Sequence, residues 1–185
     1  MGDGMVTVLG HRGYLGAVVE RRWRELGTTG DYVVCCLAPD DLPLLSRLSR
    51  APGLVVPSTD AIAENTPYAA TKRLVECLPS TVIIRAGIVD IRKRHPVAWR
   101  DWYSNPLTPL EWADLAWERR DSPGVHIAGR EAHSRADIAR LVAQTFGGDP
   151  PRAARSGVPV DRVQQPDGDR VPLAEALADY RDWLG

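Results

Sequence analysis

A tyrosine and a lysine one helical turn apart form the clearest chemical pattern in this sequence. Tyr68 and Lys72 stand in the segment PYAATK, and Thr59 precedes them in the segment VVPSTD. On a helix, residues four apart share a face, so the phenol and the ammonium would be neighbours. A nearby cation lowers the pKa of a phenol, which then donates its proton more readily. The pattern predicts proton transfer from Tyr68 to a carbonyl oxygen, with Thr59 bound to the same oxygen.

The same spacing also arises by chance on a helix that faces solvent. What favours chemistry is the order of motifs, because a glycine turn precedes the tyrosine and lysine. Gly10, Gly13 and Gly16 lie in GHRGYLG, between an apolar run and an amphipathic segment. Such a turn lets a phosphate approach the backbone at a helix N-terminus, where free N–H groups bind anions. An ordinary tight turn is the alternative reading.

Apolar runs alternate with helical patterns along the whole chain. This alternation predicts an α/β fold: a compact, Rossmann-like, three-layer arrangement with a mostly parallel sheet. We expect one domain over 1–185, in which 124–185 forms a small substrate-side portion. The predicted strands are 5–10, 31–38, 53–60, 80–89 and 124–129, and the predicted helices are 14–27, 42–50 (weak), 67–78, 110–120, 135–146 and a last one from 172. In this fold Thr59, Tyr68 and the glycine turn all follow the carboxyl ends of strands, where ligands bind.

Composition narrows the possible partners. The formal net charge of −1 gives no field that would favour nucleic acid or a membrane surface. The apolar run at 32–38 is too short to span a bilayer, and the first ten residues carry no signal pattern. Cys35, Cys36 and Cys77 have neither metal-ligand spacing nor a good disulfide partner, so we expect no metal and a cytoplasmic location.

Five stretches together resemble the dTDP-4-dehydrorhamnose reductase family, a group of sugar-nucleotide reductases within the extended short-chain dehydrogenase/reductases. They are VLGHRGYLG, DYVVCCLAPDD, VVPSTD with PYAATKRLVE, IIRAGIV, and the segments GVHIAGREAHSRADIARLVAQTFGGDP and VPLAEALADYRDWLG. The resemblance implies that Tyr68, Lys72 and Thr59 are catalytic. It implies cofactor contacts from Gly10, His11, Arg12, Gly13, Tyr14, Leu15, Gly16, Ala38 and Lys72, and substrate contacts from Ser58, Asp60 and Arg85.

The chain departs from this family in two places. The family is considerably longer between the glycine turn and the strand that 31–38 resembles, which is its fourth. We therefore expect the second and third strands to be missing, and with them the residue that binds the adenosine ribose. Alternatively, 31–38 is the second strand and Asp40 or Asp41 binds the ribose. In addition, only eight residues separate Thr59 from Tyr68, where the family has a much longer loop over the substrate.

The resemblance implies NAD(P)H-dependent reduction of a keto group on a sugar nucleotide or on a related small carbonyl compound. A non-catalytic nucleotide-binding or regulatory subunit with weak or absent cofactor binding is the first alternative. An NAD-dependent epimerase or dehydratase is the second. Members of this superfamily often dimerise through the helix that matches 67–78, so we expect a homodimer. A different partner chain could instead complete the cofactor pocket.

Overall fold

The computed structural model describes residues 4–27, 30–36, 44, 47–48, 53–92, 95–166 and 170–185. Two compact units make up the chain. The first comprises Met1–Arg85 and Pro109–His126, and the second comprises Ala86–Thr108 and Ile127–Gly185. The strand β4 (Val82–Ile88) begins in the first unit and ends in the second.

A sheet with the order β1-β2-β3-β4 forms the centre of the first unit. Its other strands are β1 (Val6–Leu9), β2 (Tyr32–Cys35) and β3 (Leu54–Thr59), and β8 (Gly124–Ile127) pairs with β4. β1 and β2 run parallel with Val6 opposite Tyr32, and β2 and β3 run parallel with Val33 opposite Leu54. All six residues of β3 are buried, as expected for a central strand covered on both faces.

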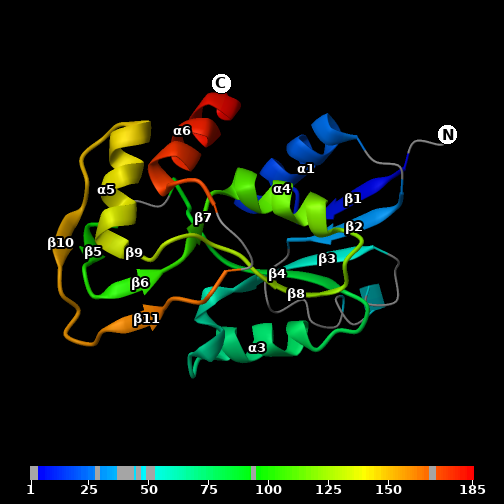
Figure 1. Cartoon of the computed structure of the whole chain (residues 1–185), viewed down its shortest axis with the longest axis horizontal. Coiled ribbons are helices and arrows are strands. Elements are labelled where there is room, and N and C mark those ends of the chain that lie inside the picture. Colours follow the sequence, from blue (N-terminus) through cyan, green and yellow to red (C-terminus); the bar gives the residue numbers. More distant parts are fainter. Residues whose placement is uncertain are drawn as a thin grey trace. The chain divides into compact units, whose positions relative to one another are not determined.

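Helices cover both faces of this sheet (Figure 1), which confirms the predicted α/β, mostly parallel fold. α1 (Tyr14–Leu26) and α4 (Pro109–Arg119) lie together on one face, and α3 (Pro67–Glu76) lies on the other. Under α3, Val75 packs in one cluster with Cys35, Leu54 and Val56. Side chains alternate between faces along a strand, so Val34 and Val55 point to the face of α1 and α4.

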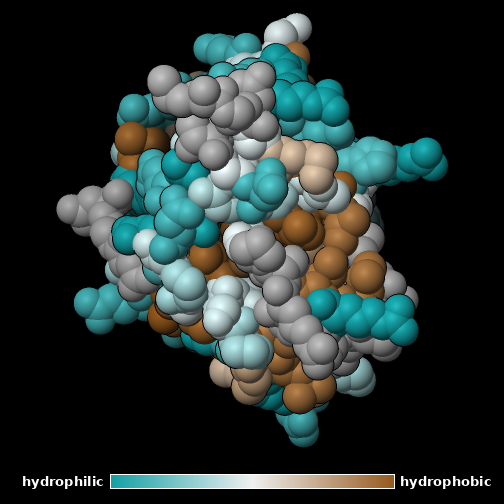
Figure 2. All heavy atoms as spheres, turned by 90° about the vertical axis from the view of Figure 1, so that its right-hand side faces the viewer, coloured by the Kyte–Doolittle hydropathy of each residue, from teal (hydrophilic) through white to brown (hydrophobic). Residues whose placement is uncertain are grey.

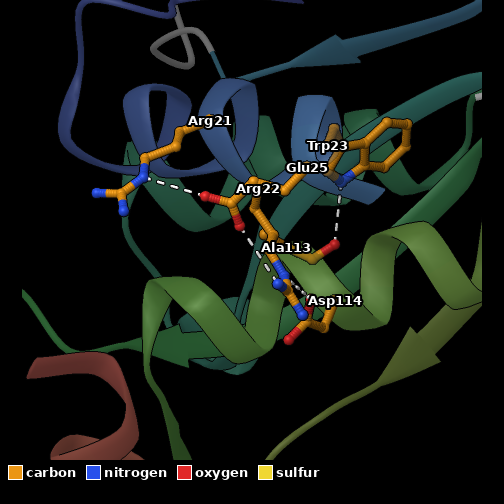
Figure 3. A network of polar contacts seen from close by, with 6 residues as sticks. All are labelled: Arg21, Arg22, Trp23, Glu25, Ala113 and Asp114. Carbon is orange, nitrogen blue, oxygen red and sulfur yellow. Dashed lines mark hydrogen bonds and ion pairs between the residues drawn. The ribbon is translucent and has the colours of Figure 1, made fainter. Parts of the chain in front are cut away.

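Polar contacts fix α1 against α4 (Figure 3). The buried Trp23 indole donates to the backbone oxygen of Ala113 at 3.0 Å. Arg22 Nε lies 2.6 Å from the Asp114 carboxylate, and Glu25 binds Arg21 and Arg22 from the next turn of α1. This contact matters for the site, because α1 begins at the glycine turn and its packing fixes the position of that turn.

The position of β2 decides which Rossmann strand it represents. In the full order 3-2-1-4-5-6, the second and fourth strands lie on opposite sides of the first. Here β2, β3 and β4 follow one another on the same side of β1, as strands 4, 5 and 6 do, whereas a second strand would lie on the other side of β1 from them. The favoured interpretation of 31–38 is thereby confirmed, and the alternative as a second strand is wrong. Within the described residues, β1 is the edge of the sheet.

The second unit is built from two helices and short strands. α5 (Arg135–Phe146) begins at Ser134, whose Oγ accepts from Asp137 N at 3.1 Å, and it packs against α6 (Leu173–Leu184). The C-terminal half of β4 pairs with β7 (Pro106–Leu107). β10 (Arg152–Ala154) pairs with β5 (Val97–Trp99), while β6 (Trp102–Ser104) pairs with β11 (Val160–Arg162) and β9 (His133–Ser134).

Sequence patterns predict the long elements of this fold and miss the short ones. Gly27 ends α1 with a φ of 69°, as its position predicts. In contrast, the connector over 148–171 contains β10 and β11, whose three residues each are too few to show an alternating pattern. Among the described residues, no helix is long and apolar enough to cross a membrane.

Candidate functional site

The beginning of α3 places Tyr68 and Lys72. Thr66 precedes the helix, and its Oγ1 accepts from Ala69 N at 3.1 Å, while Pro67 occupies the first helical position. Both are strong helix-start signals, so the helix begins just before Tyr68. The Tyr68 side chain is 46% exposed, whereas Lys72, one turn later, is only 5% exposed. The phenol therefore faces solvent beside a buried ammonium.

Lys72 bridges α3 and the end of β3. Its Nζ donates to the backbone oxygen of Pro57 at 2.8 Å and lies 5.8 Å from the centre of the Tyr68 ring. Burial lowers the pKa of Lys72, because removing water disfavours the charged form. Nearby Cys36, Cys35 and Glu76 oppose this effect and raise the pKa. The cation is thus within electrostatic reach of the phenol, as the four-residue spacing predicts.

Thr59 ends β3 and begins the next turn of chain. Its Oγ1 accepts from Ala61 N at 3.2 Å and lies 3.3 Å from the Asp60 carboxylate. The short 3₁₀ helix η2 (Asp60–Ala63) follows directly. Thr59 is buried, and its hydroxyl therefore has a defined orientation at the carboxyl end of the strand. A substrate carbonyl oxygen there would compete with the Asp60 carboxylate for the proton of the Thr59 hydroxyl.

The loop between Thr59 and Tyr68 is short and tied to α3. Arg73 Nη1 donates to the backbone oxygens of Ile62 and Glu64, at 2.7 and 3.1 Å. Glu64 N in turn donates to Ala61 O at 3.0 Å. These contacts hold the loop in a compact form close to the helix.

The glycine turn has the close packing that its sequence predicts. Gly10 has a φ of 82°, a backbone conformation that side chains disfavour, and Gly13 N donates to Gly10 O at 2.8 Å. A Cβ on Gly16 would lie 2.2 Å from Gly10 O, so only glycine allows the helix to pack this tightly. The first turn of α1 carries no acidic residue, which leaves its N-terminus suited to an anion.

Glu76 is a residue of this region that the sequence patterns did not single out. Its carboxylate accepts from Ser58 Oγ at 2.6 Å and forms a two-bond ion pair with Arg85. The side chains of Arg85 and Glu76 are 19% and 11% exposed. Ser58 and Arg85, which the resemblance implies as substrate contacts, are thus bound to Glu76. Its position one helical turn after Lys72 is the signal that could have identified it.

Some of the remaining residues predicted to bind the cofactor lie at the glycine turn, and others lie outside the described residues. His11 and Arg12 are exposed at the glycine turn, and Tyr14 and Leu15 are half-buried at the start of α1. Ala38 and the alternative ribose ligands Asp40 and Asp41 lie outside the described residues. Among described residues, no group of three or more His, Cys, Asp or Glu side chains could hold a metal ion.

Solved structures share this arrangement of elements. A dTDP-4-dehydrorhamnose reductase from Clostridium acetobutylicum is 16% identical, with a TM-score of 0.73 over 97% of this chain and 99% of that one. The enzyme of the same name from Bacillus anthracis, in complex with NADP, is 12% identical, with a TM-score of 0.76 over 97% and 99%. UDP-glucose 4-epimerase from Thermus thermophilus, in complex with NAD, is 16% identical, with a TM-score of 0.71 over 96% and 97%.

The chain has the fold of these reductases and epimerases. Comparison with models of protein families and with curated protein sequences gave no match. The structural matches extend over nearly the whole of both chains. At such low identity, the activity has to be argued from the residues of the site.

Proposed function

We propose that this protein reduces a keto group on a sugar nucleotide, or on a related small carbonyl compound, with NAD(P)H. The carrying observation is the exposed Tyr68 beside the buried Lys72, whose Nζ donates to the backbone oxygen of Pro57, two residues before Thr59. Tyr68 is the proton donor to the carbonyl oxygen, and Thr59 binds that oxygen. Lys72 favours the ionised form of the phenol, which makes the phenol a better acid. The hydride is what the nicotinamide cofactor supplies when it is bound.

The residues of the glycine turn fit half of such a cofactor. The close approach of Gly16 to Gly10 and the open N-terminus of α1 suit a pyrophosphate. The neighbouring structures in complex with NADP or NAD support a nicotinamide cofactor for this fold. The adenosine half would lie beyond β1, where no further strand of the described residues pairs. We therefore propose that the protein holds NAD(P)H mainly through Gly10, Gly13 and Lys72.

A turnover assay tests this proposal. The purified protein is incubated with NADPH or NADH and a panel of dTDP- and UDP-linked 4-keto sugars, and cofactor oxidation is followed at the nicotinamide absorbance. We expect oxidation that depends on the keto sugar. If no keto sugar of the panel leads to oxidation of the cofactor, even at high concentrations of cofactor and sugar, the reductase proposal is contradicted. Nicotinamide that remains bound through purification would favour an epimerase or dehydratase instead.

A non-catalytic, nucleotide-binding subunit is the second candidate. It is favoured by the edge position of β1 and by the contacts of Ser58 and Arg85 with Glu76, which leave fewer side chains directed at a substrate. In that case a partner chain would supply the missing half of the cofactor pocket. Binding of the nucleotide without any turnover distinguishes this candidate from the reductase.

We also propose that α3 mediates a homodimer. Leu74 is 58% exposed on this helix, and burying it against a second copy would remove apolar surface from water. Light scattering at tens of micromolar should give twice the monomer mass of 20.3 kDa. Leu74→Glu should return the mass to that of the monomer, with Leu44→Glu as a control at a less exposed leucine. A monomer mass for the unchanged protein would contradict the proposal.

A further inference from the structure

Glu76 connects the two strands at the centre of the sheet to the helix that carries Tyr68 and Lys72. Ser58 of β3 and Arg85 of β4 both donate to its carboxylate, at 2.6 and 2.8 Å for the bonds to Oε1. Ser58 stands directly before Thr59, and Glu76 stands one turn after Lys72. The network therefore touches the immediate neighbours of two of the three residues proposed to act on the substrate.

Among the described residues, the groups that act on Lys72 come from two elements. Cys35 ends β2 and Cys36 follows it, while Glu76 and the Tyr68 ring belong to α3, the helix of Lys72 itself. Burial raises the pKa of Cys36 to about 12, so this thiol carries no charge near neutral pH. The remaining carboxyl group that raises the pKa of Lys72 is Glu76. Its charge is in turn shared with the Arg85 guanidinium.

We propose that Glu76, held by Arg85 and Ser58, is a positioning residue that sets the charge of Lys72 and fixes α3 against the end of β3. Glu76 and Arg85 have opposite effects on the pKa of Lys72. Glu76 favours the ammonium form of Lys72, and the positive charge of Arg85, bound to the same carboxylate, offsets part of that effect. The proposal deepens the proposed function, because the charge of Lys72 determines how acidic Tyr68 becomes.

The sequence offers a direct way to test this. Lys72 and Lys93 are the only lysines of the chain. Protein grown with ¹³C-labelled lysine therefore gives two sets of side-chain NMR signals, and Lys93→Arg identifies those of Lys72. Titration of the Cε shift with pH then reports the pKa of Lys72 in the full chain, without cofactor, substrate or turnover.

Two single variants should move this pKa in opposite directions. Glu76→Gln removes the negative charge and leaves Arg85 unbalanced, so the pKa of Lys72 should fall by about 1 to 2 units. That is the scale for charges about 6 to 10 Å apart at an effective dielectric constant of about 20. Arg85→Gln should raise it, because the carboxylate then acts on Lys72 alone. The double variant should lie close to the unchanged protein.

A merely structural network predicts a different pattern. If its loss only loosened the packing and admitted water, both single variants would raise the pKa of Lys72 toward its ordinary value. Shifts in the same direction, or no shift in either variant, would overturn the proposal. If circular dichroism shows that Glu76→Gln does not fold, Arg85→Gln alone decides. A pKa of Lys72 above its ordinary value supports the proposal, whereas a return to the ordinary value indicates loosened packing. Ser58→Ala removes a contact without a charge and should change the pKa by less than about 0.5 unit.

This measurement separates the inference from the proposed activity. Opposite shifts with no turnover would support the balance around Lys72 and contradict the reductase. Turnover without the opposite pKa shifts would support the reductase and contradict the role of Glu76. With both present, the pH profile of kcat should move with the pKa of Lys72 in each variant, whereas the KM for the keto sugar should change little.

Discussion

Tyr68→Phe is expected to lower the kcat for keto-sugar reduction by about 10² to 10⁴-fold, the range for losing a general acid. The variant removes one hydroxyl and keeps the ring, whose centre lies 5.8 Å from Lys72 Nζ. The side chain is 46% exposed, so the change should leave the stability of the fold nearly unaltered. The rate of NAD(P)H oxidation at saturating keto sugar measures the effect.

Tyr103→Phe provides the matched control for this experiment. Tyr103 has a similar exposure of 43% and belongs to the second unit, in β6. Its replacement should leave kcat unchanged. Equal rates for Tyr68→Phe and the unchanged protein would show that another group donates the proton, and the assignment of Tyr68 would then be wrong.

The isolated chain is expected to bind NAD(P)H weakly, with a loss of about 10- to 150-fold relative to a site that also binds the adenosine ribose. A hydrogen bond to a charged group contributes about 1.5 to 3 kcal/mol, and 1.4 kcal/mol corresponds to a factor of ten. In the full fold that bond comes from the second strand, and no strand of the described residues pairs with the outer edge of β1. Titration calorimetry on the purified protein measures the dissociation constant.

The surface next to β1 is the place where another contact with the adenosine ribose could replace the missing hydrogen bond. Figure 2 faces the side of Figure 1 on which β1 lies, and hydrophobic surface is exposed there among hydrophilic residues. Met5, directly before β1, is 65% exposed. Apolar surface of this kind offers no hydrogen bond to a ribose, although it could be covered by another chain.

Variants of the glycine turn test where the remaining affinity resides. Gly13→Asp places a carboxylate at the N-terminus of α1 and should abolish residual binding, because like charges repel. Gly13→Ala adds a Cβ 3.2 Å from Gly10 O without a charge, and should reduce binding far less. A dissociation constant in the low micromolar range or tighter for the unchanged chain would contradict the prediction.

The sequence predicts those parts of the site that depend on local chemistry. Thr66 and Pro67 begin α3, and the spacing of Tyr68 and Lys72 then places both near β3. The glycines fix the turn after β1 for a similarly local reason. The partner of Lys72 could not be predicted in this way, since the bond to Pro57 O depends on how α3 packs on the sheet. The same holds for Glu76, whose partners Ser58 and Arg85 come from two different strands.

The opposite faces occupied by α1 and α3 have a consequence for the handedness of the chain (Figure 1). In the full Rossmann order, the steps from strand 1 to 2 and from strand 4 to 5 go in opposite directions, and right-handed crossovers then place their helices on opposite faces. Here β1 to β2 and β3 to β4 step in the same direction, yet the two helices still lie on opposite faces. One of these two crossovers therefore has the rare left hand.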